Sequence, residues 1–223
     1  MNFRTVFNNY LSLTTVVLAN GAFPNHEFSL KLLKNARHIV CCDGAVSKLI
    51  NFGLEPHVIV GDGDSLSSDF KQKFASILHL DANQDLNDLC KAIAFCRSEN
   101  LNDILILGAT GLREDHSLGN IFHLEDFFDL NVKMLTDYGV FELIESQQII
   151  PSVKGQQISI FSLDKNDLIT SSGLRYPLEQ TALPALWQGT LNEAVSEKFS
   201  LTFNQKHLII FRSFEVKLKY WIN

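Results

Sequence analysis

The sequence predicts an α/β protein in which a parallel-sheet α/β unit is followed by a small antiparallel β-domain. Two patterns lead to this expectation. As far as about residue 141, short apolar runs alternate with segments of helical spacing, and beyond it short alternating runs follow one another without long helical stripes. The 223 residues, 46% hydrophobic and 20% charged, have an ordinary globular composition, so a long disordered chain is excluded.

Four continuous apolar runs predict the strands of the first unit. They cover residues 15–19, 38–42, 57–60 and 103–107, and each ends at a polar or glycine-bearing break. Uninterrupted β-branched and aliphatic residues are typical of strands that are buried on both faces, as in parallel sheets. A further strand is expected near residues 77–80.

Segments of helical spacing lie between these runs. Because strands alternate with helices, we expect right-handed crossovers and helices that cover the sheet. The apolar positions that predict the helices are Phe28, Leu32 and Leu33; Val46, Leu49 and Ile50; Leu86, Leu89, Ile93 and Cys96, the clearest stripe; and Leu118, Ile121, Phe122 and Phe127.

The second half of the chain has a different pattern. Residues 155–163, 199–203 and 208–211 form short alternating runs that glycine or asparagine separates, which is typical of antiparallel strands. We place the boundary near residue 145, with an uncertainty of several residues, so that the expected domains are 1–145 and 146–223. A β-domain of this size has exposed edges, which favours its being covered by the first domain or by a second subunit.

Charge and cysteine usage exclude several classes of protein. The net charge is −6 and no dense Lys/Arg run occurs, so binding to nucleic acid or to an anionic membrane is not expected. No apolar stretch is long enough for a membrane span and no secretory signal is convincing, so we expect a cytoplasmic protein. Cys41, Cys42, Cys90 and Cys96 form no CxxC pair and are expected to be buried thiols; the histidines form no zinc motif.

Glycine- and aspartate-bearing loops follow the predicted strands at residues 20–24, 43–45, 61–65 and 108–116. The carboxyl ends of parallel strands lie at one edge of a sheet, and ligands bind in the crevice outside that edge. We therefore expect these four loops to line one cleft.

Two aspartates in the third of these loops predict a cation site. Asp62 and Asp64 are two residues apart, so in an extended segment both carboxylates would point the same way, roughly 7 Å apart. Hard oxygen ligands suit Mg²⁺, which takes a few carboxylates together with substrate phosphates. The alternative is a plain Asp-Gly turn, although Asp43 on the same edge adds to the case for a site.

Asp85 and Asp88 are expected to open the helix that carries Leu86 and Leu89. Their simplest role is to cap this helix and to complement its dipole. If the N-terminus of the helix faces the cleft, Asp88 would instead supply a third or fourth carboxylate.

The loop at 108–116 has glycines that could wrap phosphates and Arg113 to neutralise them, although it is neither a Walker A loop nor GxGxxG. The alternative is that Asp115 caps a helix and Arg113 pairs with Glu114 or Asp115 at the surface. In the β-domain, the face of Trp187 could stack on a flat cationic ring, but packing into the core is the commoner fate of a single Trp.

Taken together, these motifs resemble those of the thiamine pyrophosphokinase (thiamine diphosphokinase) family. The resemblance covers roughly residues 16–215, in the order of the family. The motifs are Cys-Asp-Gly-Ala at 42–45, Val-Gly-Asp-Gly-Asp-Ser at 60–65, Gln-Asp-Leu-Asn-Asp-Leu-Cys-Lys-Ala at 84–92, Gly-Ala-Thr-Gly-Leu-Arg-Glu-Asp-His at 108–116, Ser-Gly-Leu-Arg-Tyr-Pro-Leu at 172–178 and Gly-Thr-Leu-Asn-Glu at 189–193.

The resemblance implies a Rossmann-like α/β catalytic domain, a C-terminal β-sandwich that binds thiamine, and a homodimer whose active sites lie between subunits. The implied reaction converts ATP and thiamine to thiamine diphosphate and AMP, with Mg²⁺ as cofactor. The implied catalytic residues are Asp62, Asp64, Asp88 and Arg113, and the implied metal ligands are Asp43, Asp62, Asp64 and Asp88. ATP would contact Asn20, Gly21, Asp43, Gly44, Gly108, Thr110, Gly111, Arg113, Asp115 and His116, and thiamine would contact Gln84, Trp187, Thr190 and Asn192.

Two positions depart from the family pattern. Gly63 stands where the family commonly has a bulky aromatic residue, and Asn83 stands where an Asp is usual. Neither change removes the Asp62/Asp64 pair, but both affect how the substrate would fit. The sequence does not indicate which Asp accepts the hydroxyl proton, nor which nucleoside triphosphate is preferred.

Two other functions are compatible with the residues. The segment around Asp62 and Asp64 faintly resembles the nucleophile loop of haloacid-dehalogenase-like phosphatases, in which Asp62 would be phosphorylated. A non-catalytic protein that binds thiamine or a nucleotide on the same scaffold is the other alternative.

Overall fold

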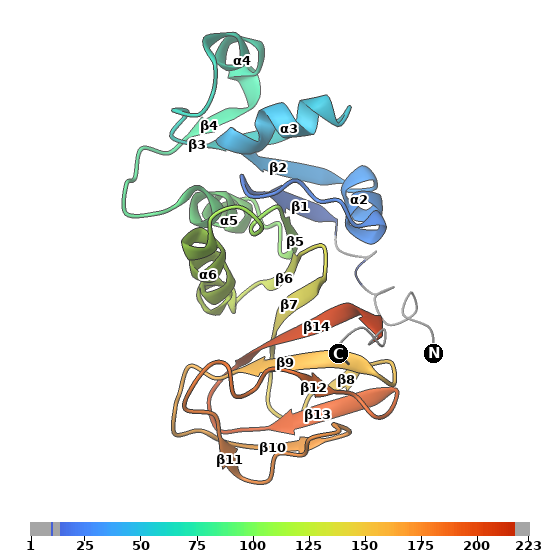
Figure 1. The fold of residues 1–223 in the computed structure, drawn as a ribbon. Coiled ribbons are helices and arrows are strands. Elements are labelled where there is room, and N and C mark those ends of the chain that lie inside the picture. Colours follow the sequence, from blue (N-terminus) through green and yellow to red (C-terminus); the bar gives the residue numbers. More distant parts are fainter. Residues whose placement is uncertain (1–9, 11–13, 217–223) are drawn as a thin grey trace. The chain divides into compact units, whose positions relative to one another are not determined.

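The computed structural model describes Tyr10 and residues 14–216, and these residues form two compact units (Figure 1). One unit comprises residues 14–137; the other comprises Tyr10 and the residues from Tyr138 onward. The division thus falls a few residues before position 145, because the first strand of the second unit precedes the point at which the sequence pattern changes. No helix within the described part of the chain is long and apolar enough to cross a membrane.

The first unit is built on a six-stranded parallel sheet, as the continuous apolar runs indicate. Its strand order is β6-β5-β1-β2-β3-β4, and every neighbouring pair is parallel, as can be followed in Figure 1. The strands are β1 (Thr15–Leu18), β2 (His38–Cys42), β3 (Val58–Gly61), β4 (Leu78–Leu80), β5 (Asp103–Leu107) and β6 (Asn131–Leu135). All four residues of β1 are buried, which accounts for its lack of polar alternation.

The order of the strands creates a switch point beside β1. From β1 the chain steps through β2, β3 and β4 in one direction, and it then returns to place β5 on the other side of β1. At such a point of an open α/β sheet, ligands bind outside the carboxyl ends of the strands. Just beyond the two strands, the Ala19 amide donates a hydrogen bond of 2.8 Å to the Leu107 carbonyl.

The helices and short 3-10 turns of this unit are α2 (Glu27–Lys34), η2 (Asp43–Ala45), α3 (Val46–Asn51), α4 (Ser68–Lys73), η3 (Ala75–Ile77), α5 (Asp88–Ser98), α6 (Glu114–Phe122) and η4 (His123–Phe127). The expectation that Asp85 opens α5 is wrong. Asn87 is the N-cap, and its side chain accepts a hydrogen bond of 2.9 Å from the Cys90 amide, so Asp85 and Leu86 precede the helix. Leu118 of α6 is exposed although its spacing suggested a buried position.

The second unit consists of two antiparallel sheets, which confirms the expected β-sandwich. One sheet has the order β12-β9-β14-β7 and the other β11-β10-β13-β8. The strands are β7 (Gly139–Ile144), β8 (Ile149–Pro151), β9 (Gln156–Phe161), β10 (Leu168–Ser172), β11 (Thr181–Ala182), β12 (Asn192–Glu193), β13 (Lys198–Thr202) and β14 (Leu208–Val216). Along β9 buried and partly exposed residues alternate, and the buried isoleucines, Ile158 and Ile160, join Phe199 and Leu201 of β13 in one core.

A buried ionic cluster lies in this second unit. The Arg212 guanidinium donates hydrogen bonds to the Glu142 carboxylate (2.5 Å), to the Tyr10 hydroxyl (2.6 Å) and to the Pro151 carbonyl (2.8 Å). The Tyr10 hydroxyl donates in turn to Glu142 over 3.1 Å. Each buried charge is thus paired and hydrogen-bonded, which is what its burial requires.

Candidate functional site

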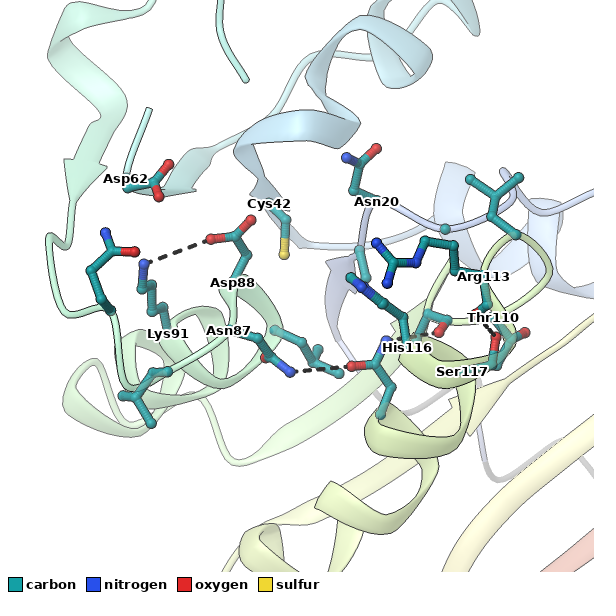
Figure 2. Close-up of a pocket in the computed structure, with 18 residues that line it drawn as sticks. Asn20, Cys42, Asp62, Asn87, Asp88, Lys91, Thr110, Arg113, His116 and Ser117 are labelled. Carbon is teal, nitrogen blue, oxygen red and sulfur yellow. Dashed lines mark hydrogen bonds and ion pairs between the residues drawn. The ribbon is translucent and has the colours of Figure 1, made fainter. Parts of the chain in front are cut away.

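A pocket of about 450 Å³ opens in the first unit, at the carboxyl ends of β1, β2, β3 and β5 (Figure 2). This is the place that the switch point of the sheet predicts. The N-terminal turns of α5 and α6 border it, so the positive ends of two helix dipoles face the same space. The pocket is lined by Ala19, Asn20, Gly21, Cys42, Asp62, Gln84, Leu86, Asn87, Asp88, Leu89, Lys91, Ala109, Thr110, Leu112, Arg113, His116, Ser117 and Asn120.

The loops after β1 and β5 are held together by their backbones. The Gly21 amide donates to the Gly108 carbonyl over 2.6 Å, and the Ala22 amide donates to the Thr110 carbonyl over 2.8 Å. A β-carbon at Gly21 would lie 2.5 Å from the Gly108 oxygen, so only glycine allows this approach. Gly108 and Gly111 both have positive φ, at 67° and 88°, which lets the second loop curl around the pocket.

Asp43 lies beneath the pocket rather than on its surface. Its side chain is 1% exposed, and its two carboxylate oxygens accept hydrogen bonds from the Gly44 and Gly63 amides. Gly61 makes room for it, because a β-carbon there would come within 2.6 Å of the Asp43 Cγ. Asp43 therefore joins the loops that follow β2 and β3.

The Asp62–Asp64 segment is a turn, and the expectation of an extended segment is wrong. Gly63 adopts a φ of 81°, and the Asp64 amide donates a hydrogen bond of 3.0 Å to the Asp62 carboxylate. Asp62 lines the pocket, whereas Asp64 is exposed and is not among the lining residues. The Asp64 amide, and after it the positive charge of Lys91, lowers the pKa of the Asp62 carboxyl group.

Asp88 and Lys91 lie on the same face of α5 and point into the pocket, opposite Arg113 and His116 (Figure 2). The Lys91 side chain is only 2% exposed, and its Nζ is 3.8 Å from an Asp88 oxygen. Burial, and then the neighbouring Asp43 carboxylate, raises the pKa of Asp88, while Lys91 opposes this shift. The pocket thus contains a buried ammonium and a carboxyl group that ionises less readily than usual.

Arg113 and Asp115 pair at the surface, as the simpler interpretation expected, but Asp115 does not cap α6, whose N-cap residue is Arg113. The Arg113 guanidinium donates to both Asp115 oxygens, at 2.6 Å and 3.1 Å, and the Arg113 side chain is 71% exposed. This pairing lowers the pKa of Asp115 to about 2. Arg113 also lines the pocket, whereas Asp115 does not. Gly44, Gly108 and Gly111 likewise shape the loops without lining it.

Sequence reasoning assigned no role to Lys91, Asn87 or Asn120. The Asn87 amide donates to Asn120 over 3.4 Å, and the Asn120 amide donates to the Ala109 carbonyl over 2.8 Å, so α5, α6 and the loop after β5 are connected. The one signal for Lys91 is its spacing, because it lies three residues after Asp88 and therefore on the same face of the helix.

The residues expected to contact thiamine are divided between the units. Gln84 lines the pocket of the first unit. Thr190 and Asn192 line a separate hollow of about 770 Å³ in the second unit, beside Tyr176 and Leu191. The Asn192 side chain holds the Tyr176 backbone through hydrogen bonds of 2.7 Å and 3.1 Å.

Trp187 does not pack into the core, which was the commoner fate considered for it. Trp187 is 73% exposed, and its backbone carbonyl accepts a hydrogen bond of 2.7 Å from the Thr190 hydroxyl. Leu191 and Tyr176 are exposed as well. All four cysteines are buried free thiols, as expected.

Comparison with protein families identifies the chain. Residues 29–136 match the model described as "Thiamin pyrophosphokinase, catalytic domain", and residues 139–211 match "Thiamin pyrophosphokinase, substrate-binding domain". The chain belongs to the thiamin pyrophosphokinase family. Among curated relatives, thiamin pyrophosphokinase 1 of Caenorhabditis elegans is 24% identical over 86% of this chain and 83% of its own length. Thiamine pyrophosphokinase 1 of Oryza sativa subsp. japonica is 29% identical over 75% of each chain.

Solved structures of thiamin pyrophosphokinases have the same fold. The yeast enzyme superposes with a TM-score of 0.76 at 16% identity, covering 97% of this chain and 91% of its own. The Candida albicans enzyme gives a TM-score of 0.73 at 20% identity, covering 92% and 90%. The family models and the relatives support a thiamine diphosphokinase function, and they do not favour a phosphohydrolase or a non-catalytic binding protein.

Proposed function

We propose that this thiamin pyrophosphokinase transfers the diphosphoryl group of ATP to the hydroxyl of thiamine in the pocket at the switch point of its sheet. The observation that carries the proposal is the composition of this pocket. It combines carboxylates, Asp62 and Asp88, with two cationic side chains, Lys91 and Arg113, below two helix N-termini. Such a site suits a triphosphate whose charge must be held and balanced during transfer.

The phosphates would be bound mainly by positive groups of α5 and α6. Free backbone amides at the start of a helix, together with its dipole, attract phosphate oxygens. Arg113 at the start of α6 can give two parallel hydrogen bonds to a phosphate if it leaves Asp115, and the buried Lys91 supplies a point charge from the other side. Of the other residues expected to contact ATP, Asn20, Gly21, Thr110 and His116 line the pocket as well.

The carboxylates of the pocket fit a Mg²⁺ ion that is shared with the substrate. No three Asp, Glu, His or Cys side chains among the described residues are grouped closely enough to hold a metal by themselves. Mg²⁺ does not need such a group, because it is usually bound by one or two carboxylates together with phosphates and water. Asp62, with its lowered pKa, is the pocket-facing ligand, and Asp64 on the same turn is the second ligand that the sequence suggests. When bound, the ion would counter the negative charge of the phosphates.

In the reaction, the hydroxyl oxygen of thiamine would form a bond to the β-phosphorus. The bond from the β-phosphorus to the bridging oxygen would break, and that oxygen would leave with AMP. The hydroxyl proton needs an acceptor within reach, and Asp88 is the better suited carboxylate because its raised pKa makes it more basic than Asp62. The family resemblance implies both a metal-binding and a catalytic role for Asp88, and its raised pKa favours the catalytic role. The part of Asp43 is to hold the turn that carries Asp62.

We further propose that the protein is a homodimer and that the second unit contributes to thiamine binding. Tyr176 and Leu191, which line the same hollow as Thr190 and Asn192, are large and exposed, and so is Trp187, which precedes the lining residue Gln188. Exposed apolar side chains of this kind mark binding surfaces. Thiamine is a flat cation, for which the exposed face of Trp187 is a suitable partner. A cytoplasmic location stays a prediction from the sequence.

The experiment that tests the function measures AMP and thiamine diphosphate together, with thiamine and Mg²⁺ omitted in turn. We expect AMP to form only when both are present. Asp62→Asn should lower kcat/KM by about 100-fold or more, because the pocket loses a carboxylate that faces the phosphates. Asp69→Asn, which changes an exposed carboxylate of α4, is the control and should leave kcat/KM unchanged. Release of phosphate without thiamine, or wild-type turnover of both Asp62→Asn and Asp64→Asn, would contradict the proposal.

A further inference from the structure

Lys48 connects α3 to the loop that follows β1. Its Nζ donates three hydrogen bonds, to the Asn20 backbone carbonyl (3.1 Å), to the Asn20 side-chain oxygen (2.9 Å) and to the Gly21 carbonyl (2.8 Å). Lys48 does not line the pocket, whereas both residues that it contacts do. The ammonium therefore affects the pocket indirectly, through Asn20 and Gly21.

The contacts of Lys48 determine which way the Asn20 carboxamide faces. Lys48 takes the side-chain oxygen of Asn20, while the nitrogen lies against Gly44, where a β-carbon would collide with it. With its oxygen held by a cation and one side packed on glycine, the Asn20 side chain has little rotational freedom. Figure 2 shows the Asn20 side chain at the edge of the pocket.

The same contacts fix the backbone of the loop. Gly21 is joined on one side to Lys48 through its carbonyl and on the other side to Gly108 through its amide. Lys48 is thus the only described cation shown bonded to this loop, and it connects the loops after β1 and β5 to the helix that follows β2. These three acceptors use all three N–H donors of the Lys48 ammonium, so none is left for a phosphate oxygen.

We infer that Lys48 is a positioning residue that holds Asn20 and Gly21 in the arrangement that binds the nucleotide. The inference rests on the proposed function, since it assigns the nucleotide to this pocket. Without Lys48 the carbonyls would be hydrated and the loop would populate other conformations. The apparent affinity for ATP falls in proportion to the fraction of molecules that keep the competent conformation.

The experiment compares three variants of the full chain. Lys48→Met removes the three hydrogen bonds and keeps most of the side-chain volume, Lys48→Arg keeps a charged donor, and Lys31→Met removes an exposed lysine of α2 as the control. Calorimetry measures the binding of Mg²⁺ with α,β-methylene-ATP, whose bridging carbon cannot be cleaved, and steady-state kinetics follows AMP release.

We expect Lys48→Met to weaken binding of the analogue and to raise KM for ATP by about tenfold, with kcat and KM for thiamine within about twofold of wild type. Lys48→Arg should recover most of the affinity, and Lys31→Met should bind as wild type does. A general loss of structure would instead lower kcat and affinity for both substrates together, which would overturn the inference.

A double mutant tests whether Lys48 acts through Asn20. If it does, Lys48→Met should weaken binding much less in an Asn20→Ala background than in wild type, because the group that it positions is already missing. Fully additive effects, or unchanged binding by Lys48→Met, would refute the inference. If wild type binds the analogue in a Lys48-dependent manner but releases no thiamine-dependent AMP, the proposed function fails and the inference stands. A wild type that does not bind the analogue overturns both.

Discussion

Replacement of Lys91 by methionine tests the electrostatic design of the pocket. The Lys91 ammonium is buried, and its distance of 3.8 Å from the Asp88 carboxylate exceeds that of a hydrogen bond. At an effective dielectric constant of about 20, the attraction between unit charges at this distance is about 4 kcal/mol. Removing an ammonium from water costs several kcal/mol, so the pair contributes little net stability. Under the proposed function, the role of this charge is to bind the phosphates.

We expect Lys91→Met to lower kcat/KM by about 10² to 10³, which corresponds to roughly 3–4 kcal/mol of lost transition-state stabilisation. The free energy of unfolding should change by no more than about 1 kcal/mol, because the Asp88 side chain is 36% exposed and remains hydrated without its partner. Lys91 also lowers the pKa of Asp88, so its loss should raise that pKa. If Asp88 must be ionised to accept the proton, the acid limb of the activity profile should move to higher pH.

The assay is thiamine-dependent AMP release as a function of pH, together with urea unfolding of each variant. Lys73→Met is the matched control, since Lys73 pairs with Glu55 at the surface of the same unit, at 3.1 Å. A folded Lys91→Met protein whose kcat/KM stays within threefold of wild type would refute the reasoning. A shift of the acid limb to lower pH would refute the assignment of Asp88.

Two further changes probe the stability of the fold. Gly63→Ala should lower the free energy of unfolding by about 1 kcal/mol or more in urea titrations, because a φ of 81° is unfavourable for alanine and its β-carbon would lie 3.0 Å from Leu80. Gly53→Ala is the control: its φ is 90° but its surroundings are open, so it should show the conformational cost alone. Equal losses in the two variants would mean that the contact with Leu80 has no effect. Glu142→Gln should lower the free energy of unfolding by about 3–5 kcal/mol in the same titration, because it removes the negative charge that the buried Arg212 guanidinium contacts. A loss below about 1 kcal/mol would show that this ion pair contributes little to stability.

The amino-acid pattern alone determined the elements of the first unit and the edge at which its site lies. Continuous apolar runs such as 38–42 are diagnostic because both faces of an inner parallel strand are covered, and the loops that follow them must share one edge of the sheet. Asn20, Asp62, Asp88 and Arg113 do line one pocket there. Their roles in binding stay predictions.

Tertiary structure alone decided which polar groups of that edge face the pocket. The position of Asp43 beneath the surface and the exposure of Trp187 have no local signature, and the burial of Lys91 has none beyond its spacing from Asp88. Lys48 meets Asn20 across 28 residues of sequence. Periodicity along a strand or a helix reports only which face of that element is apolar. Where a polar side chain points is decided by neighbours that the crossovers bring from elsewhere in the chain, through burial and through space-filling contacts, and such neighbours leave no trace in the local pattern.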